Sequence, residues 1–238
     1  MSTTFLTLVN TVLNSFGQVN LTVDEFNTAR GFHAQVKNAV NLAIQELNQQ
    51  QFEWPFNHQT ATVTLTPGTS VYSFPSTLKI ADMDTFRIAK DSSLNVNASL
   101  LTEIDYNTYL SKFFVEESNS GETGRDTPTK VYRTKTTSFG VYPSPDKAYV
   151  MSYDYFQYPV DLVNHGDLLS IPDAYVNVVI TGASKYCHEF RDNDQMVAYN
   201  DQKFKTGIEK MRTLLINRHT RVRDTRVSRV VRSVPGDL

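Results

Sequence analysis

SIPDAYVNVVITGASKYCHEF, residues 170–190, decides the fold, because it returns the chain to helical periodicity after a long stretch of strand-like sequence. Pro172 and Asp173 are typical of a first helical turn. Apolar and small residues then recur three and four positions apart, which predicts one packed helix face. This face comprises Tyr175, Val178, Val179, Gly182, Ala183, Tyr186 and Phe190. Its small members, Gly182 and Ala183, would let another helix approach closely.

Three further segments have the same periodicity. The first covers residues 5–16 and ends at Gly17. The second begins at Thr22, where Thr22 and Glu25 have the spacing of a capping box, and continues to Leu47. The third follows the polar step 191–194, with Met196, Tyr199, Lys203, Phe204, Ile208, Met211, Leu214 and Leu215 in register. Packing these faces together is the simplest way to bury them, so we predict a bundle.

Between the two helical pairs the period changes from 3.6 to 2. Residues 61–75 alternate apolar and polar side chains around Pro67 and Gly68, which predicts a β-hairpin. Further strands are expected at 85–89, 130–135, 138–142 and 149–158. We also expect a short helix over 103–113, capped by Thr102, and an exposed loop over 116–128.

The predicted fold class is therefore α+β: an antiparallel helix bundle of two N-terminal and two C-terminal helices, an inserted β-sheet region and an extended C-terminal arm. The expected boundaries are 1–56 for the N-terminal helices, 57–160 for the inserted antiparallel β region, 161–217 for the C-terminal helices and 218–238 for the arm.

Composition narrows the class of protein. Of 238 residues, 40% are hydrophobic and 20% charged, which is ordinary for a globular chain. The single cysteine, Cys187, excludes an internal disulfide framework and fits a protein made in a reducing cytoplasm. No apolar run is long enough to span a bilayer, so no membrane is expected, and residues 1–17 lack the pattern of a signal peptide.

The motif search predicts neither a catalytic centre nor a cofactor or metal site. Ser184 lacks the glycine that a nucleophile elbow needs at position 186, and a small residue at a helix contact is the better interpretation. The five histidines are scattered, and residues 192–194 lack the glycine and later glutamate of a calcium loop. Gly121 and Gly124 are not followed by the residues of a phosphate-binding loop. A carboxylate pair assembled in space, as in a glycosidase, and hence a hydrolase, stays an alternative.

The arm holds an unusual combination of residues. Residues 1–217 carry 17 Lys and Arg against 23 Asp and Glu, a net charge of −6, whereas residues 218–238 have a net charge of +4. Arginines and valines alternate there without aromatic residues: Arg218, Arg221, Val222, Arg223, Arg226, Val227, Arg229, Val230, Val231 and Arg232. Contacts with nucleic-acid phosphates depend on charge, so valines would contribute nothing to a purely electrostatic nucleic-acid-binding arm. They suit strand addition to another protein, with arginines paired to carboxylates. A nucleic-acid-binding arm stays the alternative, and a solvated tail that orders on assembly is a further one.

The layout resembles a known family, the head-to-tail adaptor (connector) proteins of tailed bacteriophages, and is similar to the tail tubular A proteins of short-tailed phages. The resemblance rests on the long second helix followed by FEWPF (52–56), on TVTLTPGTSVYSFP (62–75) leading into LKIADMDTFRIAK (78–90), and on residues 171–190 followed by a helix with Tyr199, Phe204 and Gly207. It departs from the family at 73–76, where the usual Leu-Pro-x-Asp is missing, and the arm has no counterpart that we can align.

The resemblance implies a structural role rather than catalysis. It implies a homo-oligomeric, dodecameric ring below the portal protein, with a tail nozzle or tail tube protein beneath it. DNA would pass through the lumen without sequence-specific contacts, and the acidic body would repel the duplex and let it slide. The C-terminal segment would dock on the portal. The expected location is the head-tail junction of the virion, after assembly in the host cytoplasm.

Overall fold

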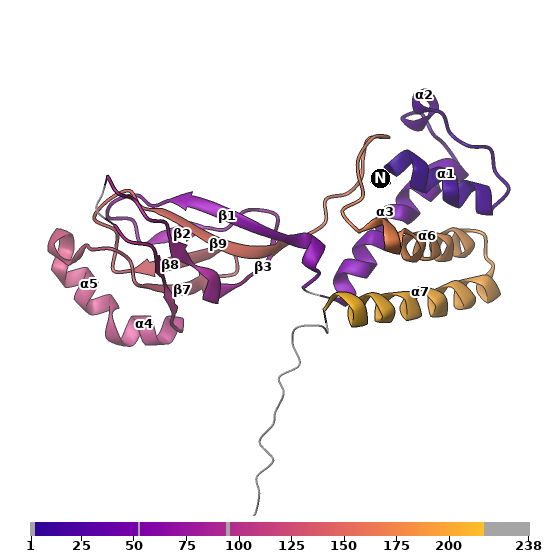
Figure 1. Ribbon diagram of the computed structural model, residues 1–238. Coiled ribbons are helices and arrows are strands. Elements are labelled where there is room, and N and C mark those ends of the chain that lie inside the picture. Colours follow the sequence, from indigo (N-terminus) through magenta and orange to yellow (C-terminus); the bar gives the residue numbers. More distant parts are fainter. Residues whose placement is uncertain (1–2, 52, 94–95, 217–238) are drawn as a thin grey trace, which may run out of the picture.

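A computed structural model describes residues 3–51, 53–93 and 96–216 of the chain. These residues form a mixed α+β fold with seven α-helices and two β-sheets. The helices near both ends of the chain gather in one part of the molecule, and the strands form another part with α4 and α5 beside them (Figure 1). The predicted fold class is thus confirmed as α+β.

The N-terminal helices are α1 (Phe5–Ser15), α2 (Val23–Phe26) and α3 (Phe32–Gln50). The helix predicted over 5–16 is confirmed. The single helix predicted from Thr22 to Leu47 is wrong. Its capping box is real, because Thr22 and Glu25 bond to each other's backbone amides, but α2 ends after one turn. At Gly31 the backbone adopts φ +57°, which favours glycine, and α3 starts afresh behind it.

The C-terminal helices are α6 (Val176–Phe190) and α7 (Asp194–Leu215), with the short 3-10 helix η4 (Asp173–Tyr175) before α6. The predicted close approach occurs at Gly182. A Cβ atom there would lie 2.7 Å from Cε2 of Phe204 on α7 and 2.9 Å from Cβ of Ala43 on α3. Three helices thus meet at one small residue. Three large side chains of the predicted faces are turned outward instead: Phe190, Tyr199 and Leu214 are 55%, 58% and 51% exposed.

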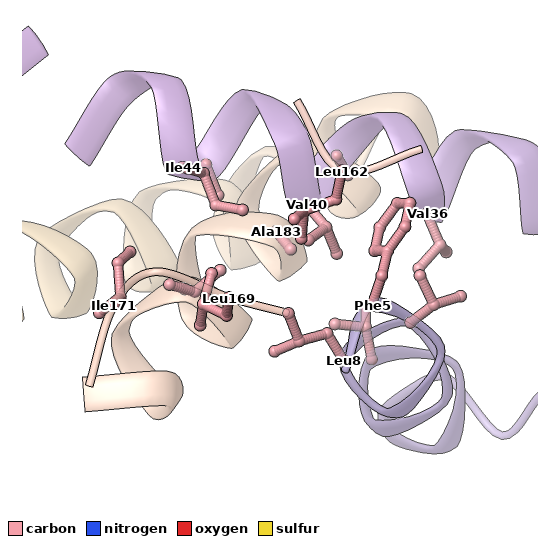
Figure 2. Packing of buried hydrophobic residues seen from close by; sticks show 14 of the residues in the cluster. Phe5, Leu8, Val36, Val40, Ile44, Leu162, Leu169, Ile171 and Ala183 are labelled. Atoms are coloured by element: carbon pink, nitrogen blue, oxygen red, sulfur yellow. The ribbon is translucent and has the colours of Figure 1, made fainter. Parts of the chain in front are cut away.

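One hydrophobic core joins helices that are far apart in the sequence (Figure 2). Phe5 and Leu8 of α1, Val36 and Val40 of α3, and Ala183 of α6 contribute to it. The segment that returns from the sheets to α6 adds three more side chains, Leu162, Leu169 and Ile171. The N-terminal and C-terminal thirds of the chain therefore fold as one unit, because neither buries its apolar face alone.

Two sheets form the second core. The five-stranded sheet has the order β1-β9-β4-β5, with β3 also paired to β9, and the four-stranded sheet has the order β2-β8-β7-β6. The strands of the first are β1 (His58–Thr64), β3 (Leu78–Ala81), β4 (Arg87–Ile88), β5 (Ser99–Leu100) and β9 (Val150–Gln157). Those of the second are β2 (Val71–Ser73), β6 (Thr102–Glu103), β7 (Lys130–Lys135) and β8 (Ser138–Tyr142). The alternation predicted from Tyr149 to Tyr155 is confirmed, because Tyr149, Met151, Tyr153 and Tyr155 are all buried.

The predicted hairpin over 61–75 is wrong. The turn at Pro67 and Gly68 exists, and Gly68 has φ +76°. However, β1 pairs with β9, whereas β2 pairs with β8 in the other sheet. The predicted strands on both sides of the turn are therefore confirmed, but the turn leads from one sheet to the other and does not join two paired strands of one sheet.

Two local predictions between the strands also need correction. Thr102 and Glu103 belong to β6, so Thr102 does not cap a helix; α4 (Tyr106–Lys112) begins later, at Asp105. The stretch predicted as a loop over 116–128 contains much of α5 (Phe114–Ser120) and the 3-10 turn η3 (Gly121–Gly124). Its polar composition reflects an exposed helix with no buried residue rather than a loop.

Several hydrogen bonds fasten the sheets to the helices. Trp54, just before the 3-10 helix η1 (Pro55–Asn57), is buried and donates its indole N–H to the Leu47 carbonyl at 3.1 Å. Lys79 on β3 donates to the carbonyls of Asn48 and Gln51 at the C-terminal end of α3. On the returning segment, Leu162 exchanges two hydrogen bonds with the Asn41 side chain. Hydrogen bonds to α3 therefore hold both chain segments that connect the two cores, the one before β1 and the one after β9.

Candidate interaction surfaces

The arm residues predicted to dock on the portal lie outside the described residues. All ten of them, from Arg218 to Arg232, follow α7, which ends at Leu215 with Ile216 as its cap. The structure therefore neither supports nor opposes that assignment. The surfaces that can be built from atoms lie on the helices and sheets before residue 217.

Residues that could carry chemistry have structural contacts. Ser184 donates its hydroxyl to the Ile180 carbonyl within α6, as expected of a small residue at a helix contact. Cys187 is buried, and burial raises the pKa of its thiol to about 12, so it is not a thiolate at neutral pH. In the described part of the chain, no group of three or more His, Cys, Asp or Glu side chains could hold a metal ion. Nor is any described helix long and apolar enough to cross a bilayer.

The outer face of α3 is unusual because it carries no charge. Five of its exposed and half-exposed positions form one stripe along the helix, which we call the α3 face: Gln35, Asn38, Leu42, Gln45 and Gln49. The helix has only two charged residues, and both bind within the molecule. Lys37 donates to the Phe26 carbonyl, and Glu46 accepts from Lys185 at 2.5 Å. Exposed helix faces usually carry charged residues, whereas the centres of protein interfaces are depleted of them.

Two hollows lie along the α3 face. The first, of about 260 Å³, is shared with α6 and bordered by Leu42, Phe190 and Glu189. The second, of about 340 Å³, is shared with the segment after β9 and bordered by Gln45, Tyr158 and Asp161. Leu42, Tyr158 and Phe190 are 44%, 54% and 55% exposed. An uncharged stripe with exposed apolar side chains beside it has the composition of a protein interface.

A third hollow, of about 360 Å³, lies between α6 and α7, and we call it the α7 groove. It is lined by Asn177, Val178 and Thr181 from α6, and by Tyr199, Gln202, Lys203, Thr206, Gly207 and Lys210 from α7. Its only charged residues are the two lysines, and neither has an ion-pair partner among the described residues. The α7 groove is therefore basic, whereas the charged residues that border the hollows on the α3 face, Glu189 and Asp161, are acidic.

An aromatic patch lies beside the four-stranded sheet, where α4 packs against β7. Tyr109 stacks on Tyr132 with ring centroids 4.0 Å apart, and its hydroxyl donates to Glu117 at 2.7 Å. Burial raises the pKa of Tyr132 to about 12, so both phenols stay neutral hydrogen-bonding groups. Phe114 and Val115 point outward and are 48% and 61% exposed. This patch is a second apolar surface, far along the chain from the α3 face.

The outer edge of β1 is open in the part of the chain that the structure describes. The backbone N–H of Leu65 donates to the Tyr149 carbonyl, which extends the pairing of β1 with β9 by one residue. Because hydrogen bonds alternate along an antiparallel ladder, the backbone groups of Thr60, Thr62 and Thr64 point away from β9. The strand has seven residues and lacks the lysine, proline or bulge that commonly protects an edge.

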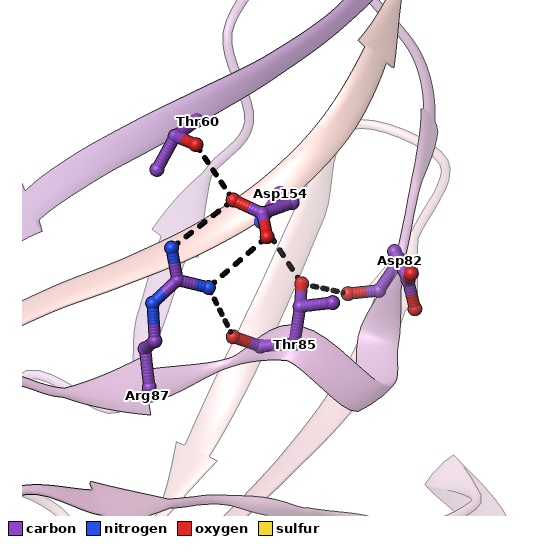
Figure 3. A network of polar contacts seen from close by, with 5 residues as sticks. All are labelled: Thr60, Asp82, Thr85, Arg87 and Asp154. Atoms are coloured by element: carbon purple, nitrogen blue, oxygen red, sulfur yellow. Dashed lines mark hydrogen bonds and ion pairs between the residues drawn. The ribbon is translucent and has the colours of Figure 1, made fainter. Parts of the chain in front are cut away.

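A polar network holds β1 and β4 against β9 on the outer face of the sheet (Figure 3). Arg87 binds Asp154 with two hydrogen bonds of 3.1 Å, and the Thr60 hydroxyl donates to the same carboxylate at 2.7 Å. The hydrogen bonds from Arg87 are the main cause that lowers the pKa of Asp154 below its usual value. Because these charges are satisfied within the fold, the network serves the sheet rather than a ligand.

The family model described as SU10 adaptor protein matches residues 3–233. The chain belongs to the SU10 adaptor protein family. This membership makes it a bacteriophage adaptor, a structural component of the virion, as the resemblance implied. No curated protein matches the sequence.

The extent of the match corrects one point of the sequence analysis. The arm had no counterpart that we could align, yet the residues matched to the SU10 adaptor protein family run to 233 and include all six arginines. The charge-free α3 face was missed, although a signal was present. Residues 32–50 contain only one lysine and one glutamate, which is sparse for a helix with an exposed side.

Proposed function

We propose that this adaptor assembles as a dodecameric ring between the portal protein and the tail, with a tail nozzle or tail tube protein bound beneath it. The observation that carries the proposal is the family match over residues 3–233. The helices, arranged as an antiparallel bundle, would form the wall of the ring. The β region, over about residues 57–160, would project from the wall toward another component. The similarity to tail tubular A proteins belongs to this proposal.

The role is structural rather than catalytic and needs no cofactor. Residues 1–217 carry a net charge of −6, which suits a lumen along which the DNA duplex slides without being held. Such repulsion acts only at short range, because charges are screened beyond about 8 Å at physiological salt.

The arm, residues 218–238, docks on the portal in this proposal. Valines would fill apolar pockets along an added strand, and the six arginines would pair with carboxylates of the portal. The family match reaches residue 233 and so includes residues 218–233 of the arm, which supports a role for the arm in the adaptor function.

A pair of variants tests the arm directly. In one, Val222, Val227, Val230 and Val231 become serine and all arginines stay; in the other, the six arginines become lysine and the valines stay. If the arm binds protein, the serine variant no longer joins portal-bearing heads, because the charges alone are insufficient. Deletion of 218–238 should give the same loss while leaving a folded body. Normal joining by the deletion variant would refute the assignment.

The second candidate function is nucleic-acid binding, favoured by the six arginines alone. It predicts that the serine variant binds duplex DNA as tightly as the parent, with affinity falling steeply as salt rises. The adaptor function predicts that both the serine variant and the parent chain bind DNA weakly at physiological salt. A virion-associated hydrolase has no observation in its favour among the described residues. Cryo-electron microscopy of assembled particles would show whether a ring lies at the head-tail junction.

A further inference from the structure

We infer that neighbouring copies in the ring contact each other through the α3 face of one copy and the α7 groove of the next. The inference rests on the proposed function, since it assigns the surfaces by which the proposed ring closes. It starts from a property of these surfaces. Both are sparse in charge, and both carry exposed apolar side chains, of which Leu42 and Tyr199 are 44% and 58% exposed.

The charges that border the two surfaces are opposite in sign. Glu189 borders the first hollow on the α3 face and Asp161 the second, and no basic residue lines either. Lys203 and Lys210 line the α7 groove, and no acid lines it. None of these four side chains forms an ion pair within the described chain. Asp161 accepts a hydrogen bond from the Gln45 side chain at 2.7 Å but keeps its negative charge, so all four can meet a charge from outside. Complementary charges of this kind steer association and fix register.

The spacing along the two helices also agrees. Asn38 in the first hollow and Gln45 in the second are seven residues apart on α3. Lys203 and Lys210 are seven residues apart on α7. At 1.5 Å of rise per residue, each pair spans about 10 Å. The spacing of the two lysines along α7 therefore matches the spacing of the two hollows along α3.

The topology favours a second copy of this chain as the partner. One surface lies between α3 and α6 and continues to the segment after β9. The other lies between α6 and α7 and is lined by different residues of α6, so the two surfaces occupy different flanks of that helix. A contact that joins two different patches of identical subunits is heterologous, and such contacts generate rings when the rotation closes. A contact of the α3 face with itself would place acid against acid.

A cross-linking experiment tests the geometry in the assembled state. Asn38 and Gln202 are both exposed, and each lines one of the two surfaces. The full-length chain with Asn38→Cys and Gln202→Cys is added to portal-bearing heads and treated with a short bismaleimide. The native Cys187 is buried and should not react. We expect a ladder of linked subunits. The control pair, Asn38→Cys with Asn119→Cys on α5, should give none.

The outcomes separate the inference from the proposed function. A ring on the heads whose subunits stay unlinked would overturn the inference and leave the adaptor function intact. Failure of the unmodified chain to form any ring on heads would overturn both. A ladder of linked subunits that the control pair does not reproduce supports both.

Charge reversal gives an independent test. Glu189→Lys alone, or Lys203→Glu with Lys210→Glu, should raise the concentration needed for half-maximal ring formation roughly tenfold or more, because like charges then face each other. Glu189 would face only one of the two lysines. Glu189→Lys should therefore restore assembly when it is combined with the substitution of that lysine by glutamate, either Lys203→Glu or Lys210→Glu, and not when it is combined with the other. All these positions are exposed, so unchanged unfolding curves are expected and confirm folding. If neither combination restores assembly, the pairing is wrong.

Discussion

At the scale of single residues, Gly182 is the position that the helical packing tolerates least. Adding one methyl group would bring a Cβ atom to 2.7 Å from the Phe204 ring and 2.9 Å from Ala43. We expect Gly182→Ala to destabilise the protein by roughly 1–3 kcal/mol, as overpacking does in closely packed cores. Urea unfolding followed by circular dichroism would measure the loss. Gly166→Ala is the control, because nothing lies within 4 Å of the added carbon there, and it should change stability little.

Asp154 should make stability depend on pH. Its pKa is lowered in the folded protein, chiefly by hydrogen bonds from Arg87, so the stabilisation is complete above the unfolded pKa of about 3.9. It disappears as the pH falls through the lower folded pKa. We expect Asp154→Asn to lower stability at pH 7 and to flatten its decline between about pH 5 and pH 2. Asp84→Asn removes an exposed carboxylate without a described ion pair and should leave the decline unchanged. A parallel decline in Asp154→Asn and the parent would contradict this account.

At the scale of elements, the connection from α3 to the sheets depends on Lys79. Its ammonium group donates to two carbonyls at the C-terminal end of α3. Lys79→Met should leave those two carbonyls without this donor and lower the free energy of unfolding by about 1–3 kcal/mol. Hydrogen exchange should then quicken at the amides of the last turn of α3, while the amides of α6 keep their protection. Uniformly faster exchange across all helices would indicate global loosening instead.

The elements themselves were largely predictable, because periodicity is a local property. The strands over 130–135 and 138–142 occupy the predicted residues, and the buried tyrosines of β9 follow from simple alternation. Pairing was not predictable, because the turn at Pro67 and Gly68 fits a hairpin as well as a crossing between sheets. The break of the second helix at Gly31 was also missed, since the apolar spacing continues across it and only the glycine marks it.

At the scale of the whole molecule, the sequence indicated the family but not the surfaces. The arginines and valines of the arm are contiguous in the sequence, so the sequence alone identifies them as a candidate binding segment. They lie outside the described residues. The hollows beside α3 and α7 combine side chains from segments that are far apart in the sequence, such as Gln45 with Asp161. Their composition becomes visible only after folding has placed these segments side by side.

The open edge of β1 has a practical consequence for overproduction. Two unpaired strand edges can pair with each other in solution and cause aggregation. This aggregation increases with the concentration of subunit that has not yet joined a head. We expect the chain made alone to collect partly in inclusion bodies. Thr62→Lys, which places a charge on the exposed face of this strand, should raise the soluble yield severalfold, whereas Thr62→Val should lower it. Equal yields from both would mean that the bare edge is harmless, and that any losses have another source.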